Sequence, residues 1–196
     1  MARILAEKTL REVLSSFAAA VPTPGGGSAC AMASAMGVAL LMKAASVAAV
    51  PGHALADVEA RLVDAVDEDA TAYQEVMAAR KQPRHSEADR VVRTAAIQRA
   101  LRHATDVPLT IMRLSAAAIT EARSLVPRVH RSTVADVTVA VMLLRAGFEG
   151  ARATVKANLG GLEDATHAAT VRDEYDRLSR EAAAGSEEAE RLLRVG

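Results

Sequence analysis

One acidic residue, Asp69, stands where the surrounding pattern predicts the apolar face of a helix. Apolar side chains recur every three or four residues at Leu55, Val58, Leu62, Val66, Tyr73 and Val76. At about 100° per residue, Asp69 falls at the centre of this stripe. An ionised carboxylate there costs free energy unless it is paired or hydrogen-bonded. Asp69 is therefore predicted either to form a buried ion pair or a helix cap, or to be a site carboxylate whose pKa is raised by burial.

A second group of polar residues lies on a helix predicted over residues 133–159. Asp136, Thr154 and Asn158 share the side of this helix that carries small residues, which is expected to pack against neighbouring helices. Asp136 and Asn158 are 22 residues apart, or about 33 Å along a straight helix, so they cannot share one local site within a subunit. An antiparallel partner helix across a two-fold axis can bring them together. The pattern predicts a homodimer with sites between subunits.

A glycine run precedes the most apolar segment of the chain. Gly25, Gly26, Gly27 and Ser28 open the predicted helix that follows them. The backbone N–H groups at such a helix start suit a carboxylate or a phosphate. The same run can also be only a tight connection between two packed helices, and it lacks the Gly-Lys-Ser/Thr of a P-loop.

Three basic residues, Arg80, Lys81 and Arg84, cluster just after the helix that carries Asp69. Such a cluster is usually a solvated helix end. The same cluster can also hold an anionic substrate tail.

Composition excludes several classes of function. The formal net charge is zero, so no bulk charge attracts nucleic acid. The lone cysteine, Cys30, rules out an internal disulfide, and it lies in an apolar run that predicts a small buried side chain. The five histidines are scattered without metal-ligand spacing, so no metal is expected. The charged N-terminus lacks the apolar stretch of a signal peptide, and a cytoplasmic location is the expectation.

The periodicity predicts an all-α, up-and-down bundle of about six to eight helices in a single domain over residues 1–196. Expected helices cover residues 4–20, 28–50, 54–80, 87–125, 133–159 and the segment after 162, with a kink or restart at Pro108 and a break at Gly185. The segment from Ser28 to Val50 is apolar enough to suggest a membrane span. Its many alanines and its internal Lys43 instead favour a buried, Ala-rich helix at the centre of the bundle.

Several segments, taken together and in order, resemble the cyclodeaminase/cyclohydrolase family of folate enzymes. The resemblance spans nearly the whole chain. It rests on Pro22–Ser28, on Asp67–Met77, on Pro83 with Ala104–Leu109, on Asp136 with Ala140, and on Val155–Leu159.

The resemblance implies an all-α dimer with a folate site near the glycine run, and no metal or redox cofactor. The implied reaction is hydrolysis of 5,10-methenyltetrahydrofolate to the 10-formyl form and its reverse. The alternative is closure of 5-formiminotetrahydrofolate with loss of ammonia. Asp69 and Asp136 are then expected to act in acid–base catalysis or to orient the substrate. The expected substrate-binding residues are Gly25, Gly26, Gly27, Ser28, Tyr73, Lys81, Arg84 and Asn158, with Lys81 and Arg84 toward the glutamate tail.

Several positions depart from the pattern that the resemblance implies. Ala45 and Thr154 replace asparagines, Gln82 replaces a leucine and Ala135 replaces a serine. Three functions therefore stay open: a folate enzyme, a related enzyme on another small substrate, and a non-catalytic dimeric helical module with a degenerate site. The absence of a formiminotransferase segment favours the cyclohydrolase among the folate activities.

Overall fold

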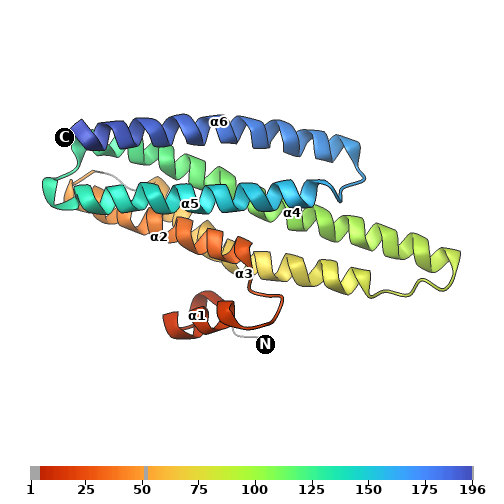
Figure 1. The fold of residues 1–196 in the computed structure, drawn as a ribbon. Helices are drawn as coiled ribbons and strands as arrows, with labels where there is room; N and C mark the ends of the chain where they lie inside the picture. Colours follow the sequence, from red (N-terminus) through yellow and green to blue (C-terminus); the bar gives the residue numbers. More distant parts are fainter. Residues whose placement is uncertain (1–4, 51–52, 196) are drawn as a thin grey trace.

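The computed structural model describes residues 5–50 and 53–195 (Figure 1). Within these residues it contains six α-helices and no strand. The helices are α1 (Leu10–Ala18), α2 (Gly26–Val47), α3 (His53–Arg80), α4 (Glu87–Leu125), α5 (Val134–Leu159) and α6 (Ala165–Val195). Helices α2 to α6 run alternately up and down, and α1 stands off to one side (Figure 1). The predicted all-α bundle is confirmed.

Helix α2 is the central element, because α3, α4 and α5 all pack against it. Its length and apolarity would also suit a membrane span, but small side chains hold it closely against α5. A Cβ on Gly147 of α5 would lie 2.1 Å from the Ser34 Oγ atom of α2, so only glycine fits there. Lys43, the one charged residue of α2, forms an ion pair with Asp136 of α5, with 2.8 Å between Nζ and Oδ2. The predicted Ala-rich central helix is confirmed.

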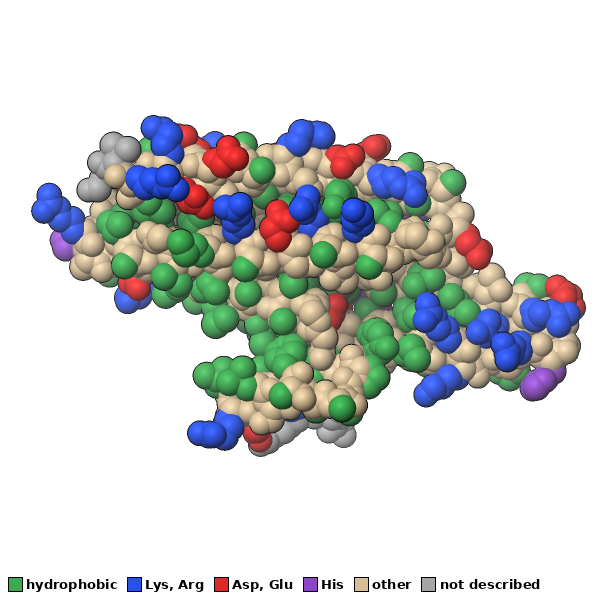
Figure 2. Space-filling model, viewed as in Figure 1, with side chains coloured by type: hydrophobic (Ala, Val, Ile, Leu, Met, Phe, Trp, Pro, Cys, Tyr) green, Lys and Arg blue, Asp and Glu red, His purple; other side chains and the backbone are tan. Residues whose placement is uncertain are grey.

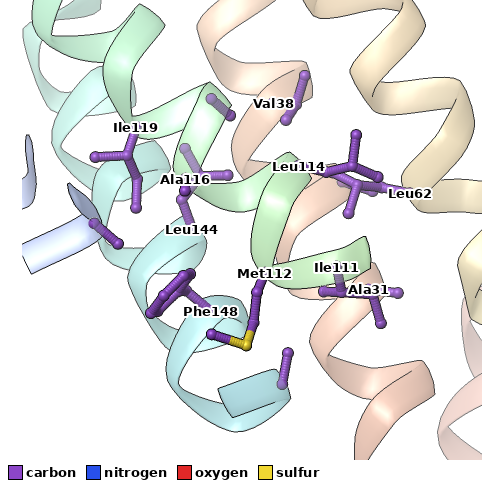
Figure 3. Packing of buried hydrophobic residues seen from close by; sticks show 14 of the residues in the cluster. Ala31, Val38, Leu62, Ile111, Met112, Leu114, Ala116, Ile119, Leu144 and Phe148 are labelled. Atoms are coloured by element: carbon purple, nitrogen blue, oxygen red, sulfur yellow. The ribbon is translucent and has the colours of Figure 1, made fainter. Parts of the chain in front are cut away.

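The core lies where α2, α3, α4 and α5 meet. Its largest fully buried side chains include Phe148, Leu41, Leu62, Met112 and Ile119. Figure 3 shows labelled side chains of these four helices pointing into one cluster. Helix α6 covers α4 and α5, and its Arg113–Glu174 ion pair to α4 joins Nε to Oε1 at 2.6 Å.

The first predicted helix is shorter than expected. The helix predicted over residues 4–20 begins only at Leu10, after a 3-10 turn at Leu5–Glu7; residue 4 lies outside the described residues. Thr9 ends that turn with a capping box, in which its hydroxyl accepts from the Glu12 N–H and the Glu12 carboxylate accepts from the Thr9 N–H. Because the cap fixes a helix start, α1 is a separate short helix.

Two predicted interruptions, a restart at Pro108 and a break at Gly185, are absent. Helix α4 continues through Pro108, and α6 continues through Gly185. A Cβ at Gly185 would lie 2.9 Å from Cγ2 of Ile119 on α4. Gly185 therefore serves the close approach of α6 to α4, and the predicted helix break there is wrong.

Candidate functional site

The Asp69 carboxylate on α3 points at the first turn of α2. Its Oδ2 atom accepts from the Ser28 N–H at 2.8 Å and from the Ser28 hydroxyl at 3.0 Å. An ideal Cβ on Gly27 would lie 1.9 Å from Oδ1, so the carboxylate fills the space above that glycine. The glycine run thus lets α3 place an acid against the backbone of α2. Asp69 is the predicted helix cap, and it also faces a pocket.

Burial raises the pKa of Asp69 above its usual value, although the two hydrogen bonds from Ser28 favour the ionised form. The side chain is half-buried. A carboxylate with a raised pKa exchanges protons closer to neutral pH, which is the property required of an acid–base catalyst.

The pocket beside Asp69 has a volume of about 460 Å³, within the range of small-molecule sites. Four parts of the chain form its wall. These are the connection before α2 with the first two residues of that helix (Pro22, Thr23, Gly25, Gly26, Gly27), α3 (Asp69, Tyr73, Val76, Met77, Arg80), α4 (Leu101, Ala104) and α5 (Thr154, Asn158). In Figure 1 the outer ends of α3 and α4 extend beyond the start of α2.

Two backbone donors lie beside the carboxylate. The first hydrogen bond within α2 runs from the Ala29 N–H to the Gly25 carbonyl at 3.2 Å. The N–H groups of Gly26 and Gly27 precede it, so they have no acceptor inside the helix. Both residues line the pocket. The site can therefore offer two N–H donors to an oxygen atom while Asp69 accepts or returns a proton.

Asn158 lines the opposite wall, where its Nδ2 atom donates to the Ala104 carbonyl of α4 at 2.6 Å. Tyr73 lies one turn after Asp69 on the same face of α3 and is 41% exposed, so its ring is available to a planar ligand. Thr154 shares the α5 wall with Asn158.

Arg80, rather than Lys81 or Arg84, is the basic residue of the pocket wall. Arg80 follows Asp69 by 11 residues, which is about three full turns and returns to the same face. Lys81 and Arg84 are exposed and lie past the end of α3. Figure 2 shows Lys and Arg side chains gathered on the projecting end of α3 and α4.

The structure does not bring Asp136 into the pocket of its own chain. Its partner Lys43 lies 15 residues after Ser28 on α2, or about 22 Å along the helix. Ser28 is fully buried and supports Asp69 instead of facing the pocket. Of the sequence-predicted residues, the pocket thus gathers Asp69, Gly25, Gly26, Gly27, Tyr73 and Asn158.

Two titratable residues border the site without lining it. His103 of α4 lies between two carboxylates of α3, with Nδ1 2.8 Å from Glu75 Oε2 and Nε2 3.3 Å from Glu68 Oε1.

Burial, with the neighbouring charge of Asp69, raises the pKa of Cys30 to about 11. The Cys30 thiol is therefore protonated at neutral pH and is no nucleophile. Within the described residues, no group of three or more potential ligands is placed to hold a metal ion.

Sequence reasoning missed Met77, Leu101 and Ala104 as wall residues, and it named Arg80 only as a member of the basic cluster. The spacing from Asp69 would have favoured Arg80 over Lys81 and Arg84, because Arg80 returns to the Asp69 face of α3. Leu101 and Ala104 reach the pocket only through the packing of α4 on α3, which no local pattern encodes.

The chain is similar to known proteins over most of its length. A family model described as formiminotransferase-cyclodeaminase matches residues 9–177. A methenyltetrahydrofolate cyclohydrolase from Methylorubrum extorquens is 31% identical over 92% of this chain and 93% of its own length. The formimidoyltransferase-cyclodeaminase of Sus scrofa is 29% identical over 91% of this chain, but the match spans 35% of that longer protein. The structure of formiminotetrahydrofolate cyclodeaminase from Thermotoga maritima shares the fold, with a TM-score of 0.85, 23% identity and 96% of each chain covered.

Proposed function

We propose that this chain, which belongs to the formiminotransferase-cyclodeaminase family, interconverts 5,10-methenyltetrahydrofolate and 10-formyltetrahydrofolate as a cyclohydrolase. The observation that carries the proposal is the Asp69 carboxylate, held by Ser28 at the wall of the pocket with its pKa raised by burial. Support also comes from the similarity to the Methylorubrum extorquens cyclohydrolase, which extends over nearly the full length of both chains.

The chemistry matches the charges of the pocket. The methenyl bridge of the substrate is an amidinium cation, which a carboxylate at the wall attracts. Asp69 accepts a proton from a water molecule as the water oxygen bonds to the bridge carbon. The bond from that carbon to N5 then breaks, N5 receives the proton from Asp69, and the carbinol oxygen loses its proton to become the formyl carbonyl. The sum is one water consumed and one proton released.

The remaining wall residues have roles in binding. The N–H groups of Gly26 and Gly27 donate to the oxygen that adds to the bridge carbon. Tyr73 supplies an aromatic face to the pterin ring, and Asn158 hydrogen-bonds to it. Arg80 attracts the glutamate carboxylates at the pocket mouth, with Lys81 and Arg84 contributing charge further out. The reaction in this scheme needs no cofactor.

A second candidate reaction uses the same groups. The Sus scrofa and Rattus norvegicus formimidoyltransferase-cyclodeaminases are 29% and 28% identical over 91% of this chain. In cyclodeamination, N10 of 5-formiminotetrahydrofolate attacks the formimino carbon, and the proton of N10 passes to the imino nitrogen. Asp69 delivers a second proton to that nitrogen, the carbon–nitrogen bond breaks, and ammonia leaves as the methenyl bridge forms.

We also propose that the chain acts as a homodimer. Apolar side chains are exposed on α1 (Leu10, 74%; Leu14, 59%) and on α2 and α5 (Met36, 54%; Met142, 59%). Figure 2 shows hydrophobic side chains on α1 and on the bundle surface beside it. Burial of such a surface favours association, and a partner subunit is the route by which Asp136 can reach a site. A sedimentation experiment at micromolar concentration tests this, and a lone monomer there contradicts it.

The activity test follows the ultraviolet band of methenyltetrahydrofolate in buffer, with wild-type protein and with two variants. Wild type is expected to accelerate loss of the band. Asp69→Asn, which keeps the shape but cannot accept a proton, is expected to lose about 100-fold or more of kcat. Asp64→Asn, an exposed aspartate on the same helix, is the matched control and retains activity.

Parallel assays with 5-formiminotetrahydrofolate and ammonia detection separate the two reactions. Acceleration of that reaction alone assigns the chain as a cyclodeaminase. If the protein changes neither reaction and binds neither compound, the folate proposal is wrong.

A further inference from the structure

Helix α4 carries a proline, Pro108, in its interior. Proline has no N–H, so it cannot donate to the carbonyl four residues earlier, which belongs to Ala104. Pro108 is buried and Ala104 is half-buried. A carbonyl left without a donor in such surroundings costs free energy.

The missing donor comes from another helix. Nδ2 of Asn158 on α5 reaches the Ala104 carbonyl at 2.6 Å. The Ala104 carbonyl, which the proline leaves without its helical donor, thus accepts from α5 instead. Pro108 and Asn158 are therefore linked through one backbone oxygen, although Pro108 does not line the pocket.

This hydrogen bond fixes which end of the Asn158 amide is available to a ligand. A side-chain amide has a donor end and an acceptor end, and an unrestrained one can rotate to offer either. Because Nδ2 is held by Ala104, Oδ1 is the atom left for the pocket that both residues line. The wall then offers this acceptor to an N–H donor of the ligand.

We propose that Pro108 is a positioning residue that acts through the Ala104 carbonyl to hold Asn158 as a hydrogen-bond acceptor for the substrate. The inference rests on the proposed folate site, and it specifies that the N–H groups of the pterin pyrimidine ring meet Asn158. Pro108 thereby sets the polarity of that wall from within α4.

The link itself is tested without any activity, by nuclear magnetic resonance of the Asn158 side-chain amide. Its signal is identified by its loss in Asn158→Ala. The test variant is Pro108→Ala, which restores an N–H at position 108 and suits a helix. We expect the Asn158 amide signal to shift to that of a solvated amide. An unchanged signal in Pro108→Ala overturns the proposal.

The functional consequence is tested by a double-mutant cycle with methenyltetrahydrofolate. Pro108→Ala is expected to raise KM about tenfold and to change kcat by less than about twofold. In an Asn158→Ala background, Pro108→Ala is expected to add nothing. An equal rise of KM in both backgrounds would show that Pro108 does not act through Asn158, and would overturn the proposal.

A control variant, and the amide signal measured without any activity, distinguish failure of this inference from failure of the proposed function. Pro127→Ala changes an exposed proline outside the pocket and is expected to leave KM unchanged. If wild-type protein does not turn over methenyltetrahydrofolate, the proposed function fails, while the amide signal still decides whether Pro108 positions Asn158.

Discussion

The Asp69 carboxylate occupies the space that a side chain on Gly27 would need: an ideal Cβ on Gly27 lies 1.9 Å from Oδ1 and 2.4 Å from Cγ of Asp69. The glycine is therefore required by the close approach of α3 to the first turn of α2. The relationship joins the two strongest features of the sequence, the glycine run and the acid on an apolar stripe, in one contact.

Gly27→Ala tests this contact. The added methyl group must displace the carboxylate, so we expect unfolding free energy to fall by roughly 1–3 kcal/mol, as for other overpacked sites, and catalytic activity to be lost with it. Urea unfolding and the ultraviolet assay measure the two effects. Gly26→Ala is the matched control for stability, because nothing lies within 4 Å of a Cβ at Gly26. Equal losses of stability in both variants would contradict the assigned contact.

Ser28→Ala tests the support of the carboxylate. The Ser28 hydroxyl favours the ionised form of Asp69, so its removal raises the pKa of Asp69 further. We expect the pH profile of kcat/KM to move to higher pH, and the variant to lose roughly 1–2 kcal/mol of stability at neutral pH. Ser28→Thr, which retains a hydroxyl, is expected to keep the wild-type profile if the fold accommodates its methyl group. An unmoved profile in a folded Ser28→Ala protein would remove Asp69 as the titrating base.

The pKa of Asp69 also predicts how stability depends on pH. In the folded protein this pKa is raised above 3.8, so between 3.8 and the folded value the native state holds a proton that the unfolded chain has released. Stability from this residue therefore falls as pH rises through that window. Asp69→Asn cannot titrate, so its stability relative to wild type is expected to increase with pH across the window and then level off. Urea unfolding from about pH 4 to about pH 8 measures this, and a constant difference would contradict it.

Much of this arrangement could be predicted from periodicity. Helical phase alone placed Asp69 on an inward face, and the pattern of small residues identified α2 as the central helix. The partner of Asp69 could not be predicted, because Ser28 lies 41 residues earlier in the chain. The hydrogen bond depends on how α3 packs on α2, which is tertiary information.

Where the structure differs from the predictions made from the sequence, the causes are equally local. A restart of α4 at Pro108 was predicted as one outcome, but Asn158 satisfies the carbonyl that the proline leaves unpaired, and the helix continues through Pro108. Asp136 was inferred to act in a site, and within its own chain it neutralises Lys43. Whether Asp136 reaches a site depends on a second subunit, whose placement no single-chain pattern contains.

His103 gives a second prediction for how stability depends on pH, in the same direction as that for Asp69. The hydrogen bond to Glu75 raises the pKa of His103 above 6.5, aided by Glu68. A raised histidine pKa contributes stability that is fully present below 6.5 and is lost as pH rises through the folded value. His103→Gln is therefore expected to be less stable than wild type in acid and to approach it in alkali. Thermal unfolding at pH values below and above 6.5 measures this difference in stability. In the His103→Gln background, the further substitution Glu75→Gln should change stability little. A deficit that grows toward alkaline pH would contradict the assignment.

Arg80 and Lys81 are adjacent in sequence but differ in position, which allows a matched comparison at the pocket mouth. Arg80 returns to the Asp69 face of α3 and lines the pocket, whereas Lys81 lies beyond the helix end. The backbone carbonyl of Arg80, which accepts from the Arg93 guanidinium, is unaffected by substitution of the side chain.

Arg80→Ala is expected to raise KM for a folate substrate about tenfold, equivalent to about 1.4 kcal/mol of binding. Lys81→Ala is expected to change KM by less than about twofold, because an exposed charge is screened. The same assay in added salt should shrink both effects. An equal effect of Lys81→Ala would show that the glutamate tail leaves the pocket by a path different from the one that Arg80 marks.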